Sequence, residues 1–278
     1  MSLRPWFVAM LLVVCSSFSA HAEGLLQPRD QKLFQAAVSA LARGAPSKAI
    51  DQFELLADHG VVHPDISYDR ALAYIERARS PHAQPGDLGR AVAALSEDLA
   101  LRPGDEAAKI LLGRVRSELS RARSRSGTTS LLARPSLQRA IVGLLPENIW
   151  AGLALFFSLS TTAGLLLRLL ASSARRRFVG ATLAWLGLGL GITFAGMTAL
   201  SARQRTRTRD AIVVVPAARL LDASGAALSG KPLQGADSSI PEGSRLAVLG
   251  QVQGLYRVEW GQVTAYLPMT ELQLLPKR

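Results

Sequence analysis

Two long uncharged apolar runs place the strongest limit on what this chain can fold into. The first is IWAGLALFFSLSTTAGLLL (149–167) and the second is FVGATLAWLGLGLGITFAGMTALSA (178–202). At about 1.5 Å per helical residue, each run can cross a hydrocarbon layer about 30 Å thick. Uncharged runs of this length are rare in the core of a soluble protein, which is the alternative. We therefore predict transmembrane helices over 149–170 and 178–202, with Trp150 as an interfacial anchor.

Positive charge is concentrated near these runs. The chain of 278 residues has a formal net charge of +11. Between Arg114 and Arg209 there are 15 arginines and only two acids, whereas acids slightly outnumber bases elsewhere. A basic excess beside apolar spans is typical of contact with anionic lipids and of topology control. This distribution argues against nucleic acid as a partner.

Residues 1–22 have the layout of a secretory signal peptide. Arg4 precedes an apolar run, and the small-residue pattern AHA ends at Ala22, where we predict cleavage. The only cysteine, Cys15, lies inside this segment. Lipidation of Cys15 is the alternative, although Val14 is bulkier than the residue usual before a lipidated cysteine. Once the signal is removed the chain has no cysteine, so disulfides play no part.

The loop 168–177 between the two spans contains no acid and four arginines, namely Arg168, Arg175, Arg176 and Arg177. By the positive-inside tendency it faces the cytoplasm. A second cluster, RQRTRTR (203–209), lies across the second span with the same sign, so charge alone does not fix the orientation. The signal peptide decides, because it exports the segment that follows it. We predict a protein of the bacterial inner membrane with its N-terminal and C-terminal domains in the periplasm.

Two glycines in the second span, Gly187 and Gly191, have the small-xxx-small spacing that permits close helix approach. We expect this pattern to pack the two spans against each other. An intermolecular contact is the alternative.

Helical periodicity dominates from about residue 30 to residue 120, and glycine and proline breaks divide it into five helices. Ala37 and Ala71 are 34 residues apart, with Ala49 between them, which is the period of tetratricopeptide (TPR) repeats. The chain resembles the TPR family at its small and large apolar positions, its closing proline and its restarting glycine. These residues are Ala37, Ala49, Phe53, Ala71, Tyr74, Ala91, Leu95, Pro103 and Gly113.

The resemblance implies an all-α TPR-like repeat domain over 23–125, made of two repeats and a closing helix. DLGRAVAALSEDLALRPGD (87–105) is then the second helix of the second repeat. An irregular helical bundle with accidental spacing is the alternative. The chain departs from the TPR pattern by the insertion ARSPHAQPGD and at Leu33, Leu56, Ser67 and Asp98.

Residues 211–278 contain short β-prone runs separated by turns, notably Pro241-Glu242-Gly243. The order of this turn, a strand, LYRVEW, a glycine, a strand and YLP resembles bacterial SH3-like domains, which implies a small all-β barrel. In such domains an aromatic-lined groove binds peptide or wall material. The available aromatics are Tyr256, Trp260 and Tyr266. The alternation in LYRVEW puts Tyr256 and Trp260 on one face of the strand. The alternative to a groove is that this face fills the barrel core.

The sequence contains no pattern that indicates a catalytic, cofactor or metal site. His59 and His63 are four residues apart, but Gly60 and Pro64 argue against the regular helix that would present both to a metal. There is no phosphate-binding glycine loop with lysine, no nucleophile elbow, no CxxC and no convincing carboxylate pair. We expect that the protein is not an enzyme.

The order of signal peptide, TPR-like repeats, basic tether (126–148), transmembrane hairpin (149–202) and SH3-like domain resembles the BatE proteins of bacterial aerotolerance (Bat) operons. That resemblance implies an inner-membrane adaptor or scaffold in an envelope complex linked to stress tolerance. Its partners would be other Bat proteins, including von Willebrand factor A-type proteins. The competing hypothesis is an envelope anchor or sensor that binds peptidoglycan through its C-terminal domain.

Overall fold

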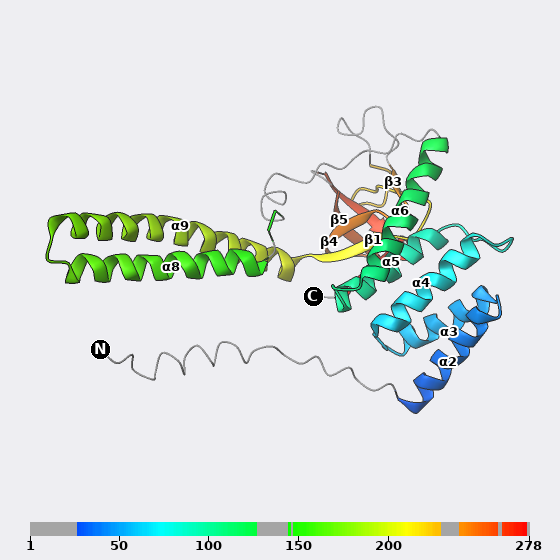
Figure 1. Ribbon diagram of the computed structural model, residues 1–278. Helices are drawn as coiled ribbons and strands as arrows, with labels where there is room; N and C mark the ends of the chain where they lie inside the picture. The colour runs from blue at the N-terminus through cyan, green and yellow to red at the C-terminus, as the bar shows by residue number, and fades with distance from the viewer. Residues whose placement is uncertain (1–26, 127–143, 146, 229–238, 261–262, 277–278) are drawn as a thin grey trace.

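The computed structural model describes residues 27–126, 144–145, 147–228, 239–260 and 263–276. Within these residues the chain is rich in helix, with two long apolar helices and a small antiparallel sheet (Figure 1). The predicted signal peptide (1–22) and most of the predicted tether (126–148) lie outside the described residues.

Five successive helices form the N-terminal part, which we call the helical unit. They are α2 (Pro28–Ala42), α3 (Pro46–Asp58), α4 (Pro64–Ala78), α5 (Asp87–Leu101) and α6 (Glu106–Ser126). The first three begin with proline, whose missing N–H costs no hydrogen bond at that position and whose φ suits a helix. Gly44 and Gly60, both at positive φ, follow the ends of α2 and α3 and let the chain reverse. Each helix packs mainly on its neighbours in sequence.

The helices α8 (Glu147–Leu170) and α9 (Ala174–Arg207) form a long antiparallel hairpin (Figure 1). Small residues let the two backbones approach closely. A Cβ added to Gly180 would lie 2.7 Å from the Arg168 nitrogen, and one added to Gly187 would lie 2.6 Å from the Thr161 Oγ1. A Cβ added to Gly191 would meet its nearest atom at 3.8 Å. Gly187 therefore lies at a tight crossing within the hairpin, while Gly191 lies at ordinary contact distance.

The hairpin helices extend beyond the apolar runs, and the bend between them is shorter than predicted. Helix α9 begins at Ala174, so three arginines expected in the loop 168–177 lie in its first turn. Only residues 171–173 separate the two helices. A helix satisfies its own main-chain hydrogen bonds and so continues through the charged ends of an apolar span.

The outer surface of the hairpin is apolar and uncovered. Only 6% of the apolar stretch of α8 and 17% of that of α9 is buried, which is unlike the core helices of a soluble protein. Exposed side chains include Leu155, Phe156, Leu169, Leu170, Phe178 and Trp185. By length and composition both helices could span a membrane.

The C-terminal part, which we call the β unit, contains a five-stranded antiparallel sheet in the order β6-β5-β4-β1-β7 and a two-stranded ribbon β2-β3. The strands are β1 (Arg209–Val213), β2 (Ala217–Arg219), β3 (Ser239–Pro241), β4 (Arg245–Val252), β5 (Leu255–Trp260), β6 (Val263–Pro268) and β7 (Leu272–Leu274), with a short 3-10 helix η2 (Met269–Glu271) before the last.

The expected barrel does not close among the described residues, because β6 and β7 remain the two edges of the sheet. Residue Leu221 bridges to Tyr266 on the β6 side, and the β2-β3 ribbon contributes Ala218 and Ile240 to the sheet's core. The opposite face of β1 is covered by the helical unit. The bridge at Leu221 thus covers part of the β6 edge, whereas the ribbon and the helical unit cover faces of the sheet.

Strand β1 joins the β unit to the helical unit, and its two faces belong to different cores. Ala211 and Val213 pack in the core of the sheet. Ile212 and Val214 pack in the core of the helical unit, together with Leu275. A strand covered on both faces is apolar throughout, which accounts for the unbroken run AIVVV. The two units therefore lie together at one end of the hairpin that links them in sequence (Figure 1).

Candidate binding surfaces

The small and large apolar residues of the TPR-like register meet inside the helical unit. Ala37, Ala49, Ala71 and Ala91 lie on four successive helices, and all are fully buried. Phe53 and Leu95 are also fully buried, and Tyr74 is 5% exposed. Small residues at these positions let neighbouring helices pack closely, as the predicted register requires.

Two residues of the predicted register lie elsewhere. Pro103 is exposed in the turn between α5 and α6. Gly113 is exposed on α6, and a Cβ added there would meet nothing within 4 Å. The small residue that α6 buries is Ala108. No close helix crossing requires a glycine at position 113.

A polar seam runs along α4 between α3 and α5. Arg70, 3% exposed, donates to Glu97 Oε2 at 2.6 Å. The Tyr74 hydroxyl donates to Glu54 Oε1 at 2.9 Å, and burial together with the Glu54 charge raises the Tyr74 pKa. These paired groups hold α4 in place, with Arg70 and Tyr74 buried and the Glu54 side chain partly exposed.

An exposed ion pair links the end of α4 to α6. It joins Arg79, the residue after α4, to Glu118 at 2.8 Å. Helical spacing places Leu72 and Glu76 on the Arg79 side of α4, and Ile110 and Arg114 on the Glu118 side of α6. Ile110 is 56% exposed. We call these six residues the α4–α6 face, which combines exposed apolar surface with charges of both signs.

The junction between the two units centres on the beginning of α5. The Gly89 N–H donates to Glu242 Oε1 at 2.5 Å, so the Pro241-Glu242-Gly243 turn contacts the first turn of the helix. Burial raises the Glu242 pKa, and the nearby Asp87 adds to the rise. A helix N-terminus favours a carboxylate, which offsets part of this cost.

Glycines on both sides make this close contact possible. Gly86, at φ +89°, would place a Cβ 2.0 Å from the Val214 carbonyl oxygen. Gly243, at φ +75°, would place one 2.7 Å from Leu119 Cδ1. The sequence reading treated the two modules as separate and missed this junction. The unbroken AIVVV run was the available signal for this junction. A strand with one face open to solvent would alternate apolar and polar residues.

A buried ion pair fixes the same end of α5. Arg77 donates through Nη2 to Asp87 Oδ1 at 2.6 Å, and both side chains are nearly inaccessible, at 6% and 1% exposure. Asp87 Oδ2 also accepts from the Gln84 N–H. The insertion that interrupts the TPR-like pattern thus ends by positioning Gly86 and Asp87 at the junction.

The three candidate aromatics of the β unit do not share one face. Tyr256 pairs with Leu267 and Trp260 with Val263 across β5 and β6, and both aromatics pack against the sheet's core. Tyr266 pairs with Arg257 one register position away, so it lies on the opposite face. The predicted aromatic groove is not assembled from these residues.

The four predicted topology arginines gather at the bend of the hairpin. Arg168 lies in the last turn of α8, and Arg175, Arg176 and Arg177 lie in the first turn of α9. All four are exposed, and Arg177 Nε donates to the Ala171 carbonyl at 2.9 Å. Such a cluster suits contact with lipid phosphates at one end of the hairpin.

Each histidine near the α3–α4 turn has a separate role. His59 Nδ1 lies 3.2 Å from Asp30 Oδ1. His63 Nδ1 accepts from the Asp65 N–H at 3.3 Å and caps α4. Within the described ranges, no group of three or more potential ligands is placed to hold a metal ion.

Asp98 is the most unusual charged residue of the helical unit. It is fully buried, and within the part of the chain that the structure describes neither carboxylate oxygen has a hydrogen-bond partner. Burial and the nearby Asp105 raise the Asp98 pKa to about 6. It occupies a position where the TPR pattern usually has a small residue.

Comparisons of the chain with protein-family models, with curated proteins and with solved structures found no match.

Proposed function

We propose that this protein is a membrane-tethered adaptor, in which the docked helical and β units act as one body that holds a protein partner at the membrane. The observation that carries the proposal is the junction. It ties the five-helix unit to the β unit at one end of an apolar hairpin with an uncovered outer surface. Such a body can hold a partner at a fixed distance from a bilayer.

The partner surface that we assign is the α4–α6 face. It contains Ile110, one of the most exposed large apolar side chains of the helical unit, between charges that can orient a partner. Apolar anchors surrounded by charged residues are typical of protein interfaces. In keeping with the resemblance to BatE proteins, the expected partner is a von Willebrand factor A-type protein of the same envelope complex. A non-enzymatic role is part of the proposal.

Peptidoglycan binding by the β unit has less support. Tyr256 and Trp260 pack toward the sheet's core, and Tyr266 lies on the other face. A groove for wall material would have to come from other residues.

The test is capture of a von Willebrand factor A-type protein by the detergent-solubilised full chain. Ile110→Glu should reduce capture at least about tenfold, because it replaces the most exposed apolar side chain of this face with a charge. The matched control is Leu55→Glu on α3, which is similarly exposed at 41% and lies outside this face. Equal capture by both variants and the wild type would remove the α4–α6 face from the proposal. Ala71 and Tyr74 are unsuitable targets because both are buried.

Location is tested separately. We propose that both units lie in the periplasm of a bacterial inner membrane, which the signal peptide favours. A periplasm-active reporter fused after Arg278 should be active, and a silent reporter would reverse the proposed topology.

A further inference from the structure

A cavity of about 280 Å³ lies between the helical unit and the β unit. Its apolar wall comes from both units and consists of Leu99, Ala100, Leu112, Leu275 and Pro276. Its charged lining consists of Arg116 on α6, Arg245 on β4, and Arg209 and Asp210 at the start of β1. This lining therefore contains three arginines and one aspartate.

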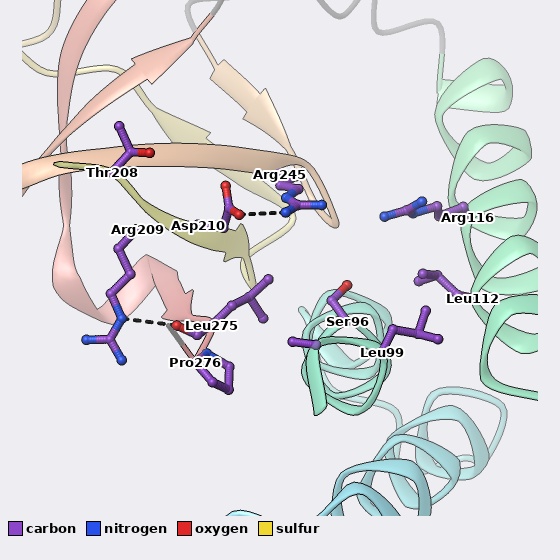
Figure 2. Close-up of a pocket in the computed structure, with 11 residues that line it drawn as sticks. Ser96, Leu99, Leu112, Arg116, Thr208, Arg209, Asp210, Arg245, Leu275 and Pro276 are labelled. Carbon is purple, nitrogen blue, oxygen red and sulfur yellow. Dashed lines mark hydrogen bonds and ion pairs between the residues drawn. The ribbon is translucent and has the colours of Figure 1, made fainter. Parts of the chain in front are cut away.

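Two of the arginines face each other across the cavity. Figure 2 shows the Arg116 side chain pointing from α6 toward Arg245, whose Nη2 is bound to Asp210 Oδ2 at 2.5 Å. Arg209 is turned the other way, and its Nε donates to the Leu275 carbonyl at 3.0 Å. Asp210 is therefore engaged by Arg245.

Arg116 lacks a matching acid. It makes no hydrogen bond or ion pair with any residue that the structure describes. Although its side chain is exposed overall, partial burial of the guanidinium lowers the Arg116 pKa, and the like charge of Arg245 lowers it further. Two guanidinium groups directed at one space repel each other unless an anion lies between them.

The cavity also lies close to the end of the hairpin. The apolar span of α9 ends at Arg203, and Arg209 follows six residues later. Four helical and two extended residues cover at most about 13 Å. This end of the hairpin is opposite to the bend where Arg168 and Arg175 lie, so the two basic regions are separate.

We propose that this cavity is a binding site for a phosphoryl group, held between Arg116 and Arg245. Guanidinium groups bind phosphate oxygens with paired hydrogen bonds, and the charge of Arg116 remains after Asp210 has paired with Arg245. The apolar wall beside the arginines suits the glycerol and first methylenes of a phospholipid. The shared chemistry is the phosphoryl group, and its source is a lipid headgroup or soluble phosphate. The lipid source depends on the membrane location proposed above, whereas the soluble source does not.

The test uses the full chain in a phosphate-free sugar detergent and measures binding by native mass spectrometry and by thermal stabilisation. The probes are phosphatidylglycerol, inorganic phosphate and succinate, the last being a dianion without a phosphoryl group. Arg116→Gln should weaken binding of the phosphoryl probe about tenfold or more, because a charge-assisted contact is lost. Arg245→Gln should weaken it similarly.

The matched control is Arg121→Gln, which removes the same charge from an exposed position on the same helix outside the cavity. It should bind as the wild type does, and all variants should keep the wild-type circular dichroism spectrum. Tighter binding of phosphatidylglycerol than of inorganic phosphate assigns the lipid source, and equal binding of both assigns the soluble source. Equal losses in Arg116→Gln and Arg121→Gln, succinate binding as tight as phosphoryl binding, or no binding of any probe would overturn the proposal. Partner capture is not part of this readout, so its failure leaves the adaptor proposal to be judged by the Ile110→Glu test.

Discussion

The hairpin and the junction both rely on glycines to bring backbones close together, yet their surroundings are opposite. In the hairpin, Gly180 and Gly187 allow α8 and α9 to touch, and the outer surface is apolar and uncovered. At the junction, Gly86 and Gly243 allow the two units to touch, and buried charges lie around the contact. Close approach at glycines therefore serves both a hairpin that could span a membrane and a junction between two units. At the hairpin the surrounding side chains are apolar, whereas at the junction buried polar pairs also specify the fit.

The buried pair at the junction should have the largest effect on stability. Arg77→Met leaves Asp87 buried without its cation, so unfolding of the docked units should become easier by about 3–5 kcal/mol. The control is Arg79→Met, whose ion pair with Glu118 is partly exposed, with an expected cost below about 1 kcal/mol. Hydrogen exchange of α5 amides in the detergent-solubilised chain measures both. Similar values for the two variants would show that the junction does not depend on the buried pair.

Substitution of the junction glycine Gly86 should have the second-largest effect on stability. Gly86→Ala introduces a Cβ into the Val214 carbonyl as well as an unfavourable positive φ, so the expected cost is about 3 kcal/mol or more. Gly44→Ala shares the positive φ but meets nothing within 4 Å, so it should cost about 1–2 kcal/mol. The difference, read from the exchange protection of β1 and α5, isolates the close approach. Equal costs would mean that the two units separate easily.

Asp98 tests whether a charge without a partner weakens the helix that carries the junction. Its pKa is raised from 3.8 to about 6, so the folded state binds the proton more tightly than the unfolded state does. The destabilisation is therefore fully present above about pH 6 and disappears as the pH falls toward 3.8. Asp98→Asn should stabilise the helical unit by about 1–3 kcal/mol at pH 8 and remove this part of the pH dependence.

The control for Asp98 is Asp58→Asn, which changes an exposed carboxylate in the same unit. Denaturant unfolding at pH 8 and pH 5 compares the two variants with the wild type. An Asp98→Asn chain whose stability still rises between pH 8 and pH 5 as the wild type's does would contradict the assignment.

The smallest expected effect is that of a hairpin substitution on the junction, because the α8–α9 contact and the junction should be independent. Gly187→Leu should separate α8 from α9, because its side chain collides with Thr161 and Phe157. Protection at the junction should nevertheless stay within about 0.5 kcal/mol of the wild type, since the sites share no partner. Gly189→Leu is the control, with nothing within 4 Å of its Cβ.

The yield of an engineered disulfide measures the separation of α8 and α9 in the Gly187→Leu and Gly189→Leu variants. Cysteines introduced at Trp150 and Phe194, whose rings stack 5.8 Å apart, report the distance between α8 and α9 in a Cys15→Ser chain. Reduced yield together with altered α5 exchange would show that the hairpin and the junction are coupled.

Sequence patterns predicted the elements better than their assembly. Prolines 46 and 64, at the predicted breaks, begin helices, and the alternation of LYRVEW predicted a strand with Tyr256 and Trp260 on one face. The aromatic groove was not predictable, because whether Tyr266 joins Tyr256 depends on the pairing register of two strands. The closed barrel was expected because a short sheet needs its edges covered, whereas among the described residues β6 and β7 remain edge strands.

By itself the sequence determined where helices, strands and apolar spans occur, since these follow from local periodicity, turn residues and run length. It also determined that charge gathers at the ends of the hairpin. Only the tertiary structure decided that α5 is shared between two units, that Gly86 and Gly89 meet the β unit, and that Arg116 faces Arg245. These contacts join residues more than a hundred positions apart. Their energies depend on close packing and desolvation, which no local pattern records.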